Sequence, residues 1–496
     1  MGIDLTILLG LLRFSLKWKE EDIQVYLRGR GIELSQATIS LHSIEALVRW
    51  QLFCEERLLH LAHRLRPYVL QVDGTTTQGG PVTLRVREAK SGLTLFARQV
   101  VAESFDALVP ALLAVKVCFG DPAVIVRDDG AALQKALGHV FPGVPQQLDH
   151  FHFLSKAGEH LVKEENERLK AALVDKDGMA DLAHWSRALP TVARTPESWV
   201  GVVARLAAEE IEATRSKGSC VPFHMPYFEA WKEMTWLVEE IRAIIHARTR
   251  NGWTVDLSPL VELKRQVEEL LARPEVKDVG PRLESLVWGL DEVRRAMRLE
   301  RDRRTKGDLG PMMEADVAQV KEAVVRTGTI LRGKGDRRLT ELWGRFEGKF
   351  REEEPYLWVV ARVPGLTRST VPLERDHRGI RTGVRHRTGR ADTGEEVDLL
   401  GALLAYWDDL TNPWFIENVL TGVNLREVFA RQDPEEVRRR REALPWEGRR
   451  PCVRVAPKRR REALEKALTI LRGTGDISAQ LTSWAREELL EVAPAV

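Results

Sequence analysis

The stretch YVLQVDGTTTQGGPVTLRVREAKSGLTLFARQV (68–100) decides the fold of this 496-residue chain. Three runs in it carry the apolar and β-branched residues typical of strands, at 68–74, 81–88 and 93–100. The glycines of Gly79-Gly80 and Ser91-Gly92 suit the hairpin turns that would join these runs. The pattern therefore predicts an antiparallel three-stranded meander.

Helices and short strands alternate after this meander. The patterns predict, in order, a helix at 104–117, a buried strand within 122–130, a helix at 131–140 and a strand near 144–148. Three antiparallel strands followed by helix, strand, helix and strand are the element order of a ribonuclease H-like fold. We therefore expect an α/β core with a mixed five-stranded sheet, to which further helices are added.

Two acidic residues stand at the ends of strand-like runs, Asp73 and Asp128, and are 55 residues apart. In a ribonuclease H-like sheet the first and fourth strands are neighbours, so these carboxylates would meet. Like charges at close range raise each other's pKa unless cations neutralise them. Hard oxygen ligands suit Mg²⁺, and two ions roughly 4 Å apart can activate the attacking oxygen and stabilise the leaving one. The alternative is structural, with Asp73 in a strand-end turn and Asp128 capping a helix.

The motifs around these acids resemble those of the DDE transposases of bacterial insertion sequences and their Mutator-like relatives with a helical insertion. The stretch 72–100 is similar to the family's first block, with Asp73 as first catalytic acid, and 126–154 to the second, with Asp128 rather than Asp129 as second acid. Asp149 stands where that block has Cys, and His152 keeps its His, so both are expected near the active site. A structural role is the expectation for His150 and His152 themselves, in preference to metal ligation.

A third acid is expected much later in the chain. The stretch VPGLTRSTVPLERDHRGIRTGVRHRTGR (363–390) resembles the family's closing block, which makes Glu374 the third catalytic and metal-binding residue. Helical spacing places Glu374 on one face with Arg378, Arg381 and Arg385, whose guanidinium groups are expected to grip DNA phosphates. Glu417 in TNPWFIENVL is the rival third acid, and a solvated face is the alternative for Arg375, Arg387 and Arg390 of the same stretch.

The amino-terminal region is predicted to hold a helix-turn-helix. One helix is expected within 19–31, ended by its glycines, and a second begins near Gln36 behind a cap at Ser35. The second helix would carry Gln36, Thr38 and Ser40 into a DNA groove, although such helix pairs are also common packing units.

The domain organisation follows from these patterns. We expect an amino-terminal DNA-binding region, a first part of the core, an all-helical insertion, a closing core helix and a basic helical region, at 1–66, 67–154, 155–362, 363–410 and 411–496. The last region carries arginine and lysine clusters at 438–441, 449–450 and 458–461, of a kind that binds nucleic acid without sequence preference.

Composition narrows the class of protein. The chain is 44% hydrophobic and 30% charged with a net charge of +2, which predicts a compact globular protein and places no nucleic-acid signal in the overall charge. Its four cysteines form no CxxC pair, which argues against zinc knuckles and disulfides. The apolar stretch 5–12 is too short to span a bilayer, so we expect no membrane role and a bacterial cytoplasmic or nucleoid location.

The resemblance implies a DNA transposase. Asp73, Asp128 and Glu374 would hold two Mg²⁺ ions, for which Mn²⁺ could substitute, to cleave element ends and join the freed 3′-hydroxyl to target DNA. The implied partners are terminal-repeat DNA, target DNA and further copies of the chain in a synaptic complex. The alternatives are a ribonuclease H-like nuclease that cuts without joining, and a catalytically inactive DNA-binding regulator.

Overall fold

The computed structural model describes residues 2–76, 82–100, 102–174, 178–189, 198–216, 221–251, 256–299, 312–363, 366–389 and 393–444. The basic clusters at 449–450 and 458–461, and most of the region predicted at 411–496, lie outside these residues. Of the predicted hairpin turns, Gly79-Gly80 also lies outside them, whereas Ser91-Gly92 is described. Gly92 has a φ of +75°, a left-handed conformation that glycine adopts without strain.

A mixed five-stranded sheet forms the centre of the molecule, with strand order β3-β2-β1-β4-β5. Its strands are β1 (Val69–Thr76), β2 (Val82–Glu88), β3 (Thr94–Val100), β4 (Val124–Arg127) and β5 (Gln146–Leu148). The first three pair antiparallel, and β4 and β5 continue the sheet in parallel from β1. The meander and the alternating helices and strands predicted after it are thereby confirmed.

Alternation along the strands separates two hydrophobic cores. Val69 and Val124 face the core shared with the long helices that follow β5, whereas Leu70 and Ile125 face the other. That second core also contains residues of α4 (Phe105–Phe119), α5 (Ala131–Val140), α14 (Val371–Thr388) and α15 (Gly394–Trp407). A strand buried on both faces reads as continuous apolar sequence, as VIV in β4 does.

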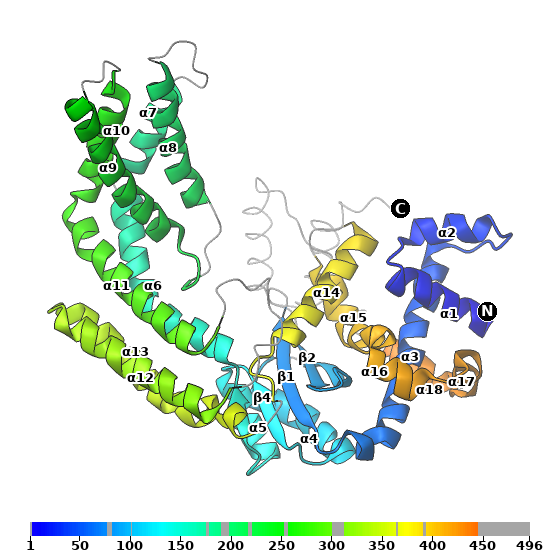
Figure 1. Ribbon diagram of the computed structural model, residues 1–496. Helices are drawn as coiled ribbons and strands as arrows, with labels where there is room; N and C mark the ends of the chain where they lie inside the picture. The colour runs from blue at the N-terminus through cyan, green and yellow to red at the C-terminus, as the bar shows by residue number, and fades with distance from the viewer. Residues whose placement is uncertain are drawn as a thin grey trace, which may run out of the picture.

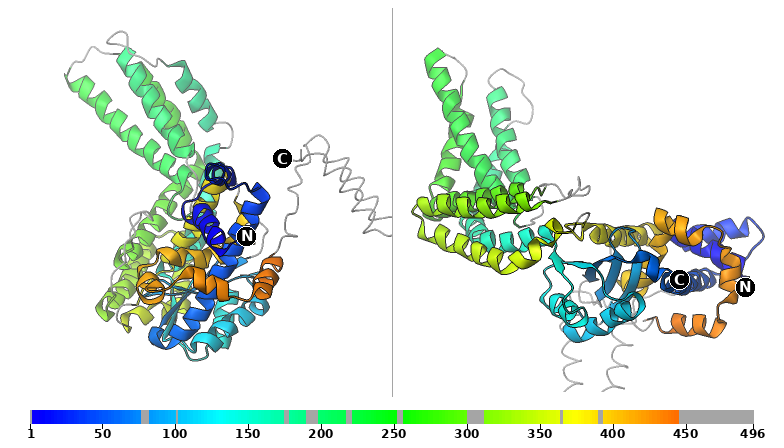
Figure 2. Two further views of the ribbon diagram at one scale, coloured as in Figure 1. Left: turned by 90° about the vertical axis from the view of Figure 1, so that its right-hand side faces the viewer. Right: turned by 60° about the horizontal axis from the view of Figure 1, so that its bottom comes forward.

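Between β5 and α14 the chain forms helices only, within the described residues. They are α6 (His150–Val174), α7 (Gly178–Ala188), α8 (Ser198–Ser216), α9 (Pro226–Asn251), α10 (Ser258–Leu271), α11 (Pro274–Ala296), α12 (Glu314–Gly333) and α13 (Arg337–Leu357), followed by the short η4 (Val359–Ala361). Helices α7 to α10 project away from the sheet, and α12 and α13 lie side by side (Figures 1 and 2). A helical stretch is thus present where an insertion was predicted, and the domain limits stay predictions.

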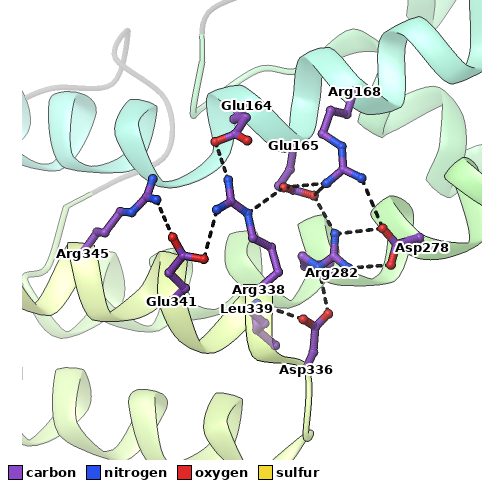
Figure 3. Close-up of polar contacts among 10 residues, drawn as sticks. All are labelled: Glu164, Glu165, Arg168, Asp278, Arg282, Asp336, Arg338, Leu339, Glu341 and Arg345. Carbon is purple, nitrogen blue, oxygen red and sulfur yellow. Dashed lines mark hydrogen bonds and ion pairs between the residues drawn. The ribbon is translucent and has the colours of Figure 1, made fainter.

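An ionic network joins three of these helices (Figure 3). Glu165 of α6 is fully buried and contacts Arg282 of α11 at 2.9 Å and Arg338 of α13 at 3.4 Å. Arg282 also contacts Asp336, the residue that caps α13, at 2.8 Å. A buried carboxylate is tolerated where several cationic donors satisfy it, so this network fixes α6 against α11 and α13.

The amino-terminal helices pack around α3, which in turn packs against α15. They are α1 (Ile3–Gly10), η1 (Leu11–Ser15), α2 (Glu20–Arg28) and α3 (Gln36–Leu65). Ser35 caps α3 by accepting a hydrogen bond from Thr38 N, as predicted. Helix α3 is 30 residues long, however, and buries Trp50, whose ring nitrogen donates to Tyr406 O of α15 at 2.7 Å. It is therefore a core helix as well as the second member of a helical pair.

The last described elements pack against this amino-terminal region. They are η5 (Asp408–Thr411), α16 (Pro413–Phe415), η6 (Ile416–Leu420), α17 (Leu425–Arg431) and α18 (Pro434–Glu442). Arg440 of α18 forms an ion pair with Glu55 of α3 at 2.7 Å. Among the helices described, none has the length and apolar character needed to cross a membrane.

Candidate active site

Asp73 and Asp128 are brought together by the parallel pairing of β1 and β4. Val72 is opposite Arg127 in the register, so the residues that follow them, Asp73 and Asp128, lie at the same end of adjacent strands. Asp128 Oδ1 accepts a hydrogen bond from Gly130 N at 3.0 Å, in the turn before α5. The N-cap of α5 is Gly130 and receives no side-chain cap, so Asp128 does not cap this helix as its structural alternative predicted.

Asp129 lies in different surroundings from Asp128. Its carbonyl oxygen accepts a hydrogen bond from Lys156 at 2.9 Å, and the positive charges near its carboxylate are those of Lys349, Lys156 and Arg127. Asp128 is the largest of the charges that raise the pKa of Asp73. The choice of Asp128 as the second acid stays a prediction.

Glu374 enters the same site from α14. The helix begins at Val371 with Pro372 in its first turn, a position where proline's missing N–H costs nothing, so Glu374 is also in the first turn. A carboxylate there is stabilised by the positive end of the helix dipole. The Glu374 side chain is partly exposed and its Oε1 lies 3.3 Å from His152 Nε2.

Asp149 ties the starts of two helices together. Its Oδ1 accepts hydrogen bonds from Phe151 N at 2.6 Å and His152 N at 3.0 Å, at the start of α6. Its Oδ2 accepts from Thr370 N at 2.5 Å, Thr370 Oγ1 at 2.9 Å and Ser369 Oγ at 2.8 Å, just before α14. The carboxylate is fully buried, and both of its oxygens accept hydrogen bonds. It therefore acts as a shared cap that fixes the start of α6 beside the start of α14.

His152 lies between Asp149 and Glu374 as a positive charge. Its Nδ1 is 3.3 Å from Asp149 Oδ2 and its Nε2 is 3.3 Å from Glu374 Oε1. Burial alone would lower the pKa of His152, but its contacts with Asp149 and the charge of Glu374 raise it to about 9. In return, despite complete burial, His152 holds the pKa of Asp149 well below its usual range.

His150 has a different role, although it is only two residues away. Its ring is fully buried and its Nε2 makes a hydrogen bond with Leu357 O at 2.6 Å. Burial lowers its pKa to about 4. The structural role expected for His150 fits these contacts, whereas His152 belongs to the acidic cluster.

The ionised form of Asp73 is electrostatically unfavourable in this arrangement. Its side chain is nearly buried, and burial raises its pKa to about 7, with Asp128 as the largest of the charges acting in the same direction. Glu374 and Asp149 add to the shift, and His152 opposes it. Negative charge at Asp73 is therefore undercompensated by the protein alone.

The donor set suits a divalent cation in kind. Mg²⁺ prefers the carboxylate oxygens that Asp73, Asp128 and Glu374 supply, and the raised pKa of Asp73 is what a nearby cation would reverse. Within the described residues, no group of three or more His, Cys, Asp or Glu side chains is arranged to hold one ion. Glu374 contacts His152 instead, so metal binding would require this carboxylate to turn from His152 toward Asp73.

Two further side chains lie near the acids and were not singled out in the sequence. His377 of α14 places its Nε2 3.7 Å from Asp73 Oδ2, and Glu103, which precedes α4, has its pKa raised by burial and by Asp128. The spacing of His377 from Glu374 was a usable signal, since residues three apart share a helix face. No sequence pattern marks Glu103.

The three arginines predicted to grip DNA follow Glu374 along α14. Arg378 and Arg385 are exposed and Arg381 is half-buried. Arg387, by contrast, is buried and pairs with Glu396 at 2.7 Å. The exposed guanidinium groups of Arg378 and Arg385 lie along the helix surface beyond Glu374. Exposure alone is the same for a solvated face and for a phosphate-binding face.

The predicted groove-reading residues of α3 are only partly available. Gln36 is exposed, but the Thr38 hydroxyl is paired with Ser35 at 2.8 Å and Ser40 Oγ accepts a hydrogen bond from Arg13 at 2.9 Å. Glu417, the rival third acid, is exposed in η6, a segment that follows α15, and is not among the charges that shift Asp73. The structure thus brings Glu374, and not Glu417, to Asp73 and Asp128.

No protein-family model matches the chain, and no curated protein matches it either. Among solved structures it is similar to the Drosophila P element transposase strand transfer complex, with a TM-score of 0.34 and 11% identity, over 83% of this chain and 92% of that one. A TM-score of this size does not establish a common fold, so no residue role is taken from that structure.

Proposed function

We propose that this protein is a DNA transposase with a ribonuclease H-like catalytic core, which cleaves the ends of an insertion sequence and joins the 3′-hydroxyl to target DNA. The observation that carries the proposal is the convergence of Asp73, Asp128 and Glu374 from β1, β4 and α14; burial raises the pKa of Asp73 to about 7, and the charges of Asp128 and Glu374 add to the shift. Structural carboxylates are normally paired with cations, whereas active sites place acids together.

The residues have distinct parts in this proposal. Asp73, Asp128 and Glu374 would hold two Mg²⁺ ions, which when bound supply activation of the attacking oxygen and stabilisation of the leaving one. Asp149 orients the helix that delivers Glu374. Arg378 and Arg385, exposed beyond Glu374, would bind the phosphates on either side of the cleaved bond. Terminal-repeat recognition by the amino-terminal helices and synapsis of several copies complete the proposal.

Cleavage and strand transfer on DNA that carries the sequences flanking the gene test this function, with Mg²⁺ or Mn²⁺. Asp73→Asn, Asp128→Asn and Glu374→Gln are expected to lose both steps by about 10³-fold or more. Asp129→Asn and Glu417→Gln are the matched controls and should retain activity, because the Asp129 carboxylate lies near Lys349, Lys156 and Arg127 and Glu417 is exposed in η6.

The alternatives give different results in the same assay. Cleavage without joining would favour the nuclease. Binding of terminal DNA by a wild-type protein that neither cuts nor joins would favour the regulator and overturn the proposal. Loss of activity in Glu417→Gln with full activity in Glu374→Gln would move the third acid.

A further inference from the structure

His377 faces the interior of the site, about a quarter of a helical turn away from the basic surface of Arg378 and Arg385 on α14. Leu373, Ile380 and Val384 of the same helix are buried with it, whereas Arg378 and Arg385 are exposed. The His377 side chain is 5% exposed and its Nε2 lies 3.7 Å from Asp73 Oδ2. One helical turn therefore carries Glu374 and, three residues on, an imidazole directed at Asp73.

Neither ring nitrogen of His377 has a hydrogen-bond partner within the described part of the chain. The 3.7 Å to Asp73 is longer than a hydrogen bond. An imidazole carries at least one ring N–H in either protonation state, so His377 holds a donor that no described residue accepts. A buried polar ring without partners is a rare exception that calls for an explanation.

Each neighbouring histidine has at least one partner. His150 bonds to Leu357 O through Nε2, although its Nδ1 has no hydrogen-bond partner among the described residues, and His152 lies 3.3 Å from a carboxylate on each side. His377 has the burial of a core residue without the bonding of one. A neutral imidazole offers one N–H donor, and the group most in need of a donor beside Asp73 in the proposed reaction is an anionic oxygen.

We propose that His377 is a further substrate-binding residue, whose ring N–H donates a hydrogen bond to an oxygen of the phosphodiester bound beside Asp73. The inference rests on the function proposed above and adds a contact that the three acids do not supply. The donor comes from the same turn of α14 as Glu374, so one helix would deliver both an acid and a phosphate contact. Its preset position costs no reorganisation when the phosphate binds.

The test compares His377→Ala and His377→Gln with wild type, and uses exposed His386→Ala on the same helix as control. Single-turnover cleavage of terminal DNA is expected to fall about 100-fold in His377→Ala and to recover about tenfold in His377→Gln, whose amide restores a donor. Binding of Mn²⁺ without DNA, followed by calorimetry, should stay within about twofold, because the ring is proposed to touch phosphate and not the cation.

Other results would overturn the inference. Full cleavage by His377→Ala alongside active wild type would remove the contact and leave the proposed function standing. A tenfold loss of Mn²⁺ affinity would make the ring a metal ligand. A wild-type protein that fails to cleave removes the proposed function, and this inference with it.

A second measurement separates substrate binding from a structural role without any reaction. His377→Leu removes two polar atoms that have no partner in the free protein, so the melting temperature without DNA should be unchanged or higher. A clear drop in melting temperature, equal to that of His150→Leu, whose hydrogen bond to Leu357 O is present in the structure, would show His377 to be a bonded core residue. That outcome would also overturn the proposal.

Discussion

Asp149 accepts a hydrogen bond from the backbone N–H of Thr370 at 2.5 Å, a contact that spans 221 residues of sequence. Asp149 follows β5 and Thr370 precedes α14, so the chain leaves the sheet region and returns to it at the same carboxylate. The helices from α6 to α13 lie between these two points. The Asp149 side chain therefore links two segments of the site that the helical stretch separates in the sequence.

Asp149→Ala should consequently disorganise the site and destabilise the protein together. The change removes the acceptor for five donors, two at α6 and three before α14, each donor being left buried. A loss of roughly 3 kcal/mol or more is expected, since hydrogen bonds to a charged group contribute about 1.5–3 kcal/mol each. Urea unfolding measures it, with exposed Asp106→Asn as control. A loss no larger than the control's would contradict the capping role.

Asp73→Asn is expected to stabilise the metal-free protein while abolishing activity. The folded-state pKa of Asp73 is raised to about 7, so its ionisation opposes folding, and this cost appears as the pH rises from about 4 to about 7. At pH 8 in EDTA the variant should be more stable by on the order of 2 kcal/mol, and at pH 4 the two proteins should match. Thermal melts at the two pH values provide the measurement. Equal stability at pH 8 would show that the carboxylate is not strained.

His152 should stabilise the folded protein at low pH, where it is protonated, and lose this effect as the pH rises. Its folded-state pKa is raised to about 9, so the stabilisation is complete below about pH 6.5 and is lost as the pH rises through about 9. His152→Gln is expected to cost about 3 kcal/mol at pH 6 and much less above pH 9.5. Unfolding in EDTA across this range, with exposed His386→Gln as reference, gives the comparison. A cost independent of pH would show that the imidazolium charge is not what stabilises the cluster.

Glu165→Gln tests the ionic network of the helical stretch. The change leaves Arg282 and Arg338 without the buried charge they share, so a loss of about 3–5 kcal/mol is expected. This corresponds to a melting temperature lower by roughly 6–10 °C. The neighbouring Glu164 supplies a matched control, because its ion pair with Arg338 is exposed and worth about 1 kcal/mol or less. Similar losses in both variants would show that burial does not strengthen the network.

The order of the sheet could be predicted from the sequence because its signals are local. The runs at 68–74, 81–88 and 93–100 show strand patterns and turn residues within a few positions of each other, and the observed strands differ from them by at most two residues at either end. Ser35 could be recognised as a cap for the same reason. The proximity of Asp73 and Asp128 could be predicted in the same way, because the element order makes β1 and β4 neighbours in the sheet.

The contacts around those acids could not be predicted, because they depend on which helix returns to the sheet and at what rotation. The spacing in α14 placed Arg378 and Arg385 on one face with Glu374, but it did not show that His377, about a quarter of a turn away, enters the core. No local pattern indicated that Asp149 caps two helices, since Thr370, at the start of the second helix, lies 221 residues later. Thr38 and Ser40 were chosen by position in a helix, and their hydroxyls are taken by Ser35 and Arg13.

Helix α6 begins at the acids and ends far from them. It runs 25 residues from His150, beside the cap at Asp149, past the buried Glu165 that fixes it to α11 and α13. Such a helix is ~37 Å long and behaves as a stiff rod, so a tilt of ~5° about one end displaces the other by ~3 Å. Helix α6 therefore connects the surroundings of His152 to the projecting helices through one continuous run of backbone hydrogen bonds.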